Sequence, residues 1–201
     1  MRDRWVWFRH EAGGSSAAAS DALNTFKVTQ PGSISGYSRE SFPHWSDAQE
    51  NCWDAPDKSC DARDAAMVRD GNGVKVDKKG CKVTKGEWPD PYTGKTLSDS
   101  KSVDIDHLVP LAEAWRSGAS SWNKGQRERY ANDPDVLLSV EAAANRQKGD
   151  KDPAAWKPPS KQERCNYAER WIQVKAKYSL SVDEEEKTAL QEMLGTCTGS
   201  S

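Results

Sequence analysis

The sequence lacks both the long apolar segments of membrane proteins and the strong net charge of many nucleic-acid binders. It has no apolar run of roughly 18 residues, the minimum for a membrane-spanning helix, and we expect no membrane partner. Its 29 basic and 31 acidic residues leave a formal net charge of -2. Any nucleic-acid-binding surface must therefore be a local group of basic side chains.

The cysteines also lack a familiar spacing, because none of the five forms a C-x-x-C pair. This argues against a zinc knuckle and against a thioredoxin-type redox site. Two disulfides with one free thiol would indicate an oxidising compartment, whereas five reduced, buried cysteines would indicate a cytosolic protein. We favour the first interpretation. The residues concerned are Cys52, Cys60, Cys81, Cys165 and Cys197.

The chain has no internal repeat, and its 201 residues suit one domain. Residues 1–20 hold a short aromatic run and then a Gly/Ser/Ala stretch. The aromatic run is too short for the apolar region of a signal peptide, and the stretch after it is typical of a flexible linker. We therefore predict a leader or linker over residues 1–20 and a single domain over residues 21–201.

Hydrophobic periodicity and turn signals predict an α+β fold. Alternating apolar and acidic residues predict a short strand within residues 101–109, and a second strand candidate covers residues 135–140. A capping box is expected at Ser181 and Glu184. The predicted hairpin covers residues 70–83, and the predicted helices cover residues 60–69, 111–118, 121–133, 141–149, 161–178 and 182–194.

The sequence has only three histidines, and one of them, His107, directly follows Asp106. An imidazole can accept a proton from water near neutral pH, and a carboxylate is a hard oxygen ligand that suits magnesium or manganese. Asp104 shares a strand face with Asp106 and would either support the site or be solvated. An isolated Asp-His pair is more often a surface or core feature, so a function needs a second group.

That second group lies at the end of a predicted short helix. Asn145 offers an amide oxygen to a metal, and Arg146, Lys148 and Lys151 offer cationic contacts to phosphates. Lys148 is also expected to take part in catalysis. The alternative is an ordinary helix C-terminus, in which Lys148 favours the helix dipole and a glycine ends the helix. Residues 145–177 carry nine basic and four acidic residues, which predicts a local basic surface.

Together the two groups resemble the HNH nuclease superfamily, also called ββα-metal or His-Me finger, and in particular its secreted branch with a His-x-x-Pro signature. The signatures stand here as His107-Leu-Val-Pro110 and Asn145-Arg-Gln-Lys148-Gly149. The resemblance extends over about residues 35–197 and implies a ββα-metal core surrounded by helices and stabilised by disulfides. Further matching segments are SGYSRESFPHW at 35–45, CDARDAAMVRDG at 60–71, YAND at 130–133 and CNYAERWI at 165–172.

The resemblance implies a role for each residue of the site. His107 would be the general base that activates the attacking water, and Asp106 and Asn145 would ligate a divalent cation. The position nine residues before Asn145, which usually orients the base, holds Val136 and cannot do so. We expect Asn132 or a backbone carbonyl to orient His107 instead.

The function that the resemblance implies is a secreted, monomeric endonuclease that hydrolyses DNA with little sequence preference and leaves 5′-phosphate ends. RNA stays open as an additional substrate. The expected cation is magnesium or manganese, with zinc as the alternative. The implied disulfides join Cys60 to Cys81 and Cys165 to Cys197, and Cys52 has no implied partner.

Two other classes of function stay open. Val136 favours a catalytically silent secreted module that binds nucleic acid or polysaccharide on the same scaffold. The tryptophan-rich segments favour a protein associated with the cell wall. A nuclease should lose its activity on His107→Ala while staying folded, whereas a binding module has no hydrolysis to lose.

Overall fold

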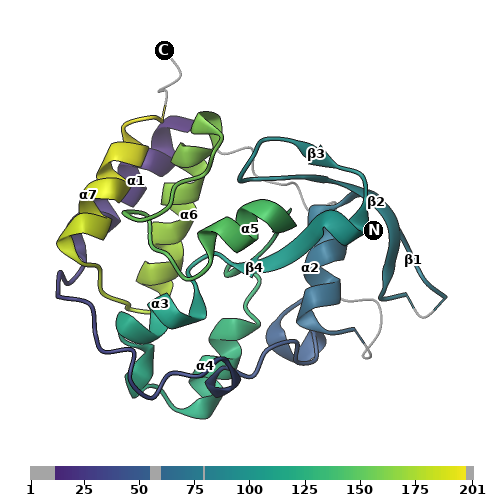
Figure 1. Cartoon of the computed structure of the whole chain (residues 1–201), viewed down its shortest axis with the longest axis horizontal. Helices are drawn as coiled ribbons and strands as arrows, with labels where there is room; N and C mark the ends of the chain where they lie inside the picture. Colours follow the sequence, from purple (N-terminus) through teal and green to yellow (C-terminus); the bar gives the residue numbers. More distant parts are fainter. Residues whose placement is uncertain (1–11, 55–59, 79, 198–201) are drawn as a thin grey trace.

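The computed structural model describes residues 12–54, 60–78 and 80–197, which form a mixed α+β structure. Its α-helices are α1 (Ala12–Thr25), α2 (Ala62–Asp70), α3 (Leu111–Arg116), α4 (Lys124–Ala131), α5 (Ala142–Lys148), α6 (Arg164–Lys177) and α7 (Glu184–Leu194). Its strands are β1 (Asn72–Val76), β2 (Val83–Pro89), β3 (Thr96–Leu97), β4 (Val103–His107) and β5 (Leu137–Glu141). Helices α1, α6 and α7 lie side by side at one end, and β1, β2 and β3 lie at the other (Figure 1).

Strands β4 and β5 form an antiparallel pair at the centre, and α5 follows β5 without a loop. The register places Asp106 opposite Leu138 and His107 opposite Leu137. Because side chains alternate along a strand, Asp106 and His107 point to opposite faces of the pair. Helices α3 and α4 are inserted between the two strands. Both predicted strands and the short helix after them are confirmed.

The pair β4–β5 separates two hydrophobic clusters. On β5, Leu138 and Val140 belong to the cluster packed by α1, α3, α6 and α7, whereas Leu137 belongs to the cluster around α2 and β2. Each cluster is built on a fully buried tryptophan, Trp171 in the first and Trp88 in the second. The strand pair is therefore held from both faces, which fixes the end of β4 in place.

Helix α1 corrects the prediction of a flexible linker over residues 1–20. Residues from Ala12 onward are helical, and Ala19 and Leu23 are buried beside α6 and α7. Alanine is the strongest helix former, and a run of small side chains lets two helices approach closely. Packing against the core decides the conformation of this segment. Residues 1–11 lie outside the described residues.

The capping box predicted at Ser181 and Glu184 is wrong by two residues. The N-cap of α7 is Asp183, whose carboxylate accepts a hydrogen bond from the backbone N–H of Glu186 at 2.8 Å. The hydroxyl of Ser181 instead donates to the carbonyl of Ser117 at 3.1 Å. Both residues satisfy a backbone group, but only Asp183 starts the helix.

The hairpin predicted over residues 70–83 is confirmed as the pair β1–β2.

Two disulfides brace the ends of the structure. Cys60–Cys81 ties the start of α2 to the hairpin, and Cys165–Cys197 ties the first turn of α6 to the chain after α7. These are the pairs that the resemblance implied, and Cys52 is a free, exposed thiol. They close loops with sequence separations of 21 and 32 residues. Loops of this size correspond to a stabilisation of about 3 kcal/mol each.

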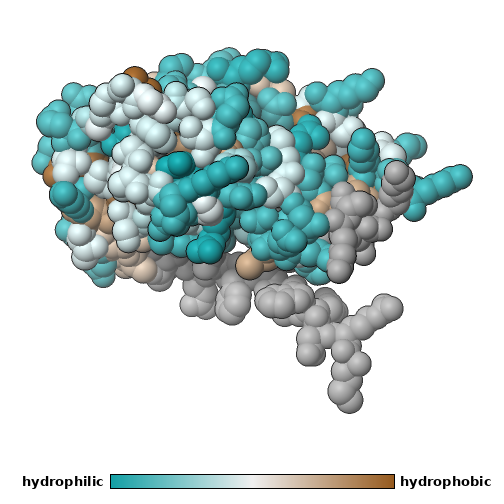
Figure 2. Space-filling view, turned by 90° about the horizontal axis from the view of Figure 1, so that it is seen from below, coloured by the Kyte–Doolittle hydropathy of each residue, from teal (hydrophilic) through white to brown (hydrophobic). Residues whose placement is uncertain are grey.

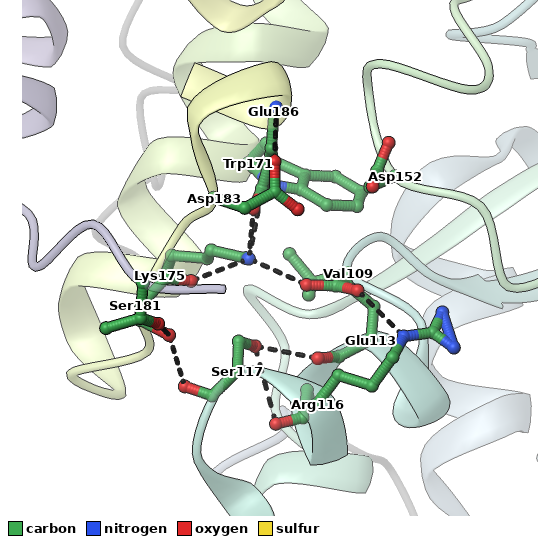
Figure 3. A network of polar contacts seen from close by, with 12 residues as sticks. Val109, Glu113, Arg116, Ser117, Asp152, Trp171, Lys175, Ser181, Asp183 and Glu186 are labelled. Atoms are coloured by element: carbon green, nitrogen blue, oxygen red, sulfur yellow. Dashed lines mark hydrogen bonds and ion pairs between the residues drawn. The ribbon is translucent and has the colours of Figure 1, made fainter. Parts of the chain in front are cut away.

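A buried ionic cluster joins α3, α6 and α7 (Figure 3). The ammonium of Lys175 lies 2.9 Å from Glu113 Oε1 and 2.7 Å from Glu186 Oε1, and it donates to the carbonyl of Ser181 at 2.8 Å. The indole of Trp171 donates to the same Glu186 carboxylate at 2.6 Å. Because Lys175 and Glu186 are almost fully buried, these contacts set the position of α3, the first helix after β4.

The surface is mainly hydrophilic on the face drawn in Figure 2, where apolar side chains form small separate patches. Among the described residues the large hydrophobic side chains that are exposed are Ile34 and Val76. None of the described helices combines the length and the apolar composition that crossing a bilayer requires.

Candidate active site

A cavity of about 320 Å³ opens at the end of β4 and at the start of the segment that leads into α3. Three residues of the predicted site line it together, namely Asp106, His107 and Asn145. Asp106 and His107 leave opposite faces of β4, but His107 is its last residue, and the cavity lies around this strand end. A larger cavity of about 720 Å³ lies between α4 and the end of α6. None of the residues lining that larger cavity is a histidine, and two of its three acids, Asp133 and Asp135, already pair with a lysine. We therefore place the chemistry in the smaller cavity.

Asp106 is a nearly buried carboxylate with a defined set of partners. Its Oδ2 atom accepts a hydrogen bond from the hydroxyl of Tyr92 at 2.5 Å and lies 2.7 Å from the ammonium of Lys148. Burial, and then the charge of Asp106, hold the pKa of Tyr92 well above its usual value. Tyr92 therefore stays a donor. Both of these contacts use Oδ2, which leaves Oδ1 for a further ligand.

Lys148 corrects a prediction, because its side chain is fully buried and cannot reach a substrate phosphate. Its ammonium also donates to the backbone carbonyl of His107 at 3.1 Å. Burial lowers the pKa of Lys148, and the adjacent Asp106 carboxylate opposes that change. Lys148 thus holds the strand end on which Asp106 and His107 lie. The helix α5 that carries it ends at Lys148, and its C-cap Gly149 has a φ of +55°, which suits glycine.

His107 is buried and has one ring nitrogen fixed. Its Nε2 atom lies 2.9 Å from the backbone carbonyl of Ala131. A carbonyl can only accept, so Nε2 carries the hydrogen and Nδ1 of the neutral ring is free to accept a proton. Burial lowers the pKa of His107 to about 3, the hydrogen bond to Ala131 raises it in part, and the charge of Arg39 lowers it further. The ring is therefore neutral at physiological pH.

Among the described residues Asn132 makes no hydrogen bond to His107, and the contact to His107 Nε2 comes from the backbone carbonyl of Ala131. The side-chain amide of Asn132 accepts from the backbone N–H of Ser46 at 2.9 Å and donates to the carbonyl of Pro43 at 2.9 Å. The segment that it holds carries His44, whose ring lies 6.2 Å from that of His107. Asn132 therefore acts on the site through the chain that covers it.

Trp45 is the most strained residue of this covering segment. Its φ of +62° lies in the left-handed region, which non-glycine residues rarely adopt. Its ring lies 5.8 Å from the ring of His107 at an interplanar angle of 33°. Such strain persists only where the surroundings enforce it, and it gathers at functional sites. Here it places an aromatic wall beside the histidine.

Asn145 is partly buried and is held by Asp104. Its Nδ2 donates to Asp104 Oδ2 at 3.3 Å, so its Oδ1 is left to accept. Asp104 thus contacts Asn145, as the supporting role would require. Since a divalent cation of the magnesium type prefers carboxylate and amide oxygens, the oxygens of Asp106 and Asn145 at one cavity fit such an ion.

Sequence reasoning did not assign a role to Arg39 and Tyr37, which also line the cavity. Arg39 is exposed, and within the described residues its guanidinium makes no hydrogen bond or ion pair. Both residues lie in the segment SGYSRESFPHW, but no spacing rule connects that segment to His107.

Arg146 and Lys151 are exposed, as phosphate contacts must be. Residues 145–177 expose fewer basic side chains than their sequence suggests, because Lys148 is buried in an ion pair.

Residues 61–193 match the model of the family described as GmrSD restriction endonucleases, C-terminal domain. The match covers more than half of the chain, so the chain belongs to this family. A relative from Arthroderma benhamiae (strain ATCC MYA-4681 / CBS 112371), named an uncharacterized secreted protein, is 42% identical over 185 residues. The similarity covers 91% of this chain and 86% of the relative. No solved structure matches.

Proposed function

We propose that this protein is a divalent-metal-dependent endonuclease that hydrolyses DNA with little sequence preference and leaves 5′-phosphate ends. The observation that carries the proposal is the geometry at the end of β4. A neutral histidine with a free Nδ1, His107, opens onto one cavity with Asp106 and Asn145. Membership in a restriction endonuclease family supports the same reaction class. In this proposal β4, β5 and α5 form an HNH-type ββα-metal core.

His107 acts as the general base in the proposed reaction. Its Nδ1 takes a proton from a water molecule, which then attacks the phosphorus in line with the leaving 3′-oxygen. The Ala131 carbonyl holds Nε2–H and so stabilises the imidazolium that forms. A low pKa makes the ring a weak base but keeps it unprotonated before each turnover. A phosphodiester resists attack because it is anionic, so cationic groups near its oxygens lower the barrier.

A divalent cation held by Asp106 and Asn145 would neutralise charge on the phosphate and on the leaving oxygen. Tyr92 and Lys148 fix the carboxylate of Asp106 from its other oxygen, and Asp104 fixes the amide of Asn145. These partners keep the two oxygens at the cavity before any ion arrives. The donor set favours magnesium or manganese over zinc, which prefers nitrogen and sulfur ligands.

Arg39, Arg146 and Lys151 are the proposed phosphate contacts around the cavity. All three are exposed, and contacts to phosphates fix position without reading sequence. This supports a weak sequence preference. It does not exclude RNA, since none of these contacts depends on the sugar.

We also propose that the protein acts outside the cell as a monomer. Two disulfides support an oxidising compartment, and the Arthroderma relative is named a secreted protein. We propose one nuclease domain that includes α1, because α1 packs into the same core as α6 and α7.

The test is cleavage of supercoiled plasmid with magnesium, with manganese, with zinc and with a chelator. The proposal expects nicking and then linear fragments that need the cation. Asp106→Asn and Asn145→Ala should each reduce the rate by about 100-fold or more, by analogy with the loss of an electrostatic catalytic contact. Asn166→Ala, on the exposed face of α6, is the matched control and should cleave like the native protein. Intact plasmid under every condition would refute the proposal.

The silent binding module loses the feature that favoured it. Val136 cannot orient a histidine, and it is fully buried. The Ala131 carbonyl makes the orienting contact in its place. The departure at Val136 therefore leaves His107 with a fixed tautomer, and we retain the enzyme as the proposed function.

A further inference from the structure

A second cavity, of about 410 Å³, lies at the free edge of β5, on the side away from β4. Its walls include Arg69, Asp70, Leu138 and Arg170. It is separate from the cavity of the candidate active site, with which it shares no lining residue. Leu138 is the strand partner of Asp106, so the two cavities lie one strand apart.

Arg170 is the unusual residue of this cavity. It lies on α6, is partly buried and lines the cavity, yet no hydrogen bond, ion pair or ring contact of its guanidinium occurs within the described residues. Burial lowers the pKa of Arg170, and the charge of the neighbouring Arg69 lowers it further. An arginine stays protonated all the same, and this guanidinium is only partly buried, so its donors are open to the cavity. A guanidinium that lines a cavity and has no partner among the described residues is available to bind an anion.

The neighbouring residues cannot supply that anion. Arg69 donates from Nε to Asp70 Oδ1 at 2.6 Å and from its Nη atoms to Asp70 Oδ2 and to the carbonyls of Pro134 and Leu137. Asp70 Oδ2 also accepts from the backbone N–H of Ser139 at 2.8 Å. The carboxylate of Asp70 is thus fully engaged and cancels the charge of Arg69. One positive charge, that of Arg170, is left in the cavity.

We propose that this cavity is a binding site for a phosphate group, with the guanidinium of Arg170 as its principal ligand. A planar guanidinium binds phosphate oxygens in a bidentate manner, and the cavity has room for the whole group. The phosphate comes either from free inorganic phosphate or from a nucleic-acid strand that crosses β5. The free-phosphate source does not rest on the proposed nuclease function. The strand source does, because it supplies a second backbone contact beside the candidate active site.

The first experiment measures the melting temperature in sodium phosphate, sodium acetate and sodium chloride at matched pH and ionic strength. Phosphate at tenfold excess over its Kd should raise the melting temperature of the native protein by about 3 °C. Acetate and chloride should not. Arg170→Gln should abolish the phosphate effect, Arg170→Lys should keep part of it, and the exposed control Arg129→Gln should keep all of it.

Three results would overturn the proposal: no phosphate effect on the native protein, an equal effect of acetate, or a full phosphate effect in Arg170→Gln. The measurements on the native protein stand even if Arg170→Gln fails to fold. None of them involves cleavage, so a failed nuclease assay does not affect them.

A second experiment identifies the source of the phosphate. Binding of a short duplex is followed by fluorescence anisotropy in the presence of chelator, with Arg129→Gln again as the charge-matched control. If a strand phosphate occupies the site, Arg170→Gln should weaken binding about tenfold more than the control, and inorganic phosphate should compete. If free phosphate is the ligand, the two variants should bind the duplex equally.

Discussion

Two buried lysines, Lys148 and Lys175, show how similar ionic groups serve different ends. Both side chains are fully buried and both lie on helices. Lys175 meets two carboxylates and a carbonyl in a cluster closed by Trp171 (Figure 3). Lys148 meets one carboxylate, Asp106, and the carbonyl of His107. Asp106 also faces a cavity, whereas the Lys175 cluster lines none of the cavities described above.

The difference between the two clusters indicates which of them can take part in chemistry. A closed cluster satisfies its own charges and fixes helices, here α3 against α6 and α7. An open pair leaves an oxygen for a ligand and holds it in place beforehand. The cost of burying both lysines is similar, but only the Lys148 pair presents a functional group to the cavity.

The largest expected effect is on stability, from Lys175→Met. The change leaves Glu113 and Glu186 buried together without a cation, and it should lower the unfolding free energy by about 3–5 kcal/mol. Urea unfolding measures the loss. The folded fraction should keep its cleavage activity, because the cluster does not touch the cavity. A loss below about 1 kcal/mol would mean that the cluster is not a structural anchor.

The same cluster predicts a pH dependence. Burial and the charge of Glu113 raise the pKa of Glu186 to about 7 against the opposing effect of Lys175. A carboxyl with a raised folded-state pKa contributes its full stability below the unfolded pKa and loses it as pH rises to about 7. Urea unfolding from pH 4.5 to 7 should therefore show a decline on the order of 3 kcal/mol that Glu186→Gln removes. An identical pH profile for both proteins would contradict this.

Lys148→Met should affect activity more than stability. Loss of the ammonium lets the Asp106 carboxylate turn, and plasmid cleavage should fall about 10–100-fold, as for other residues that orient a metal ligand. The loss of unfolding free energy should be smaller than for Lys175→Met, because the cavity gives Asp106 access to water. Lys161→Met, an exposed lysine before α6, is the control. If Lys148→Met and Lys175→Met showed the same ratio of activity loss to loss of unfolding free energy, the two lysines would not differ in role.

The smallest effect is expected at the mouth of the cavity, from Arg39→Ala. The exposed guanidinium is a proposed phosphate contact, so kcat/KM should fall about 3–10-fold and the salt dependence of DNA binding should become less steep by about one phosphate contact. Steady-state cleavage and binding at several salt concentrations measure both. Arg129→Ala should leave kcat/KM unchanged. If the salt dependence of DNA binding were unchanged in Arg39→Ala, Arg39 would not be a substrate contact.

Structural features that depend on residues close together in the sequence could be predicted. Apolar and acidic residues alternate around Asp106, and this pattern predicted strand β4 and the shared face of Asp104 and Asp106. The adjacent His107 could be read directly from the sequence. The Asn145 segment was predicted as a helix end, and α5 does end there, at Lys148 with Gly149 as its C-cap. Periodicity also predicted both long C-terminal helices, although α6 and α7 begin two to three residues later than expected.

The parts that depend on tertiary contacts could not be predicted. The carbonyl that orients His107 belongs to Ala131, whose side chain gives no signal of that role. Lys148 has the composition of an exposed helix end, and only its contact with Asp106 shows that it is buried. Arg39 precedes the family match that begins at residue 61, and it reaches the cavity only because its segment is folded over His107.

The most direct test of the central claim is plasmid cleavage by His107→Ala beside the native protein, with magnesium. Circular dichroism and the melting temperature confirm that the variant is folded. The account predicts a loss of at least about 100-fold, since a general base contributes that much or more. Undiminished cleavage by a folded His107→Ala variant would contradict it and would place the base elsewhere.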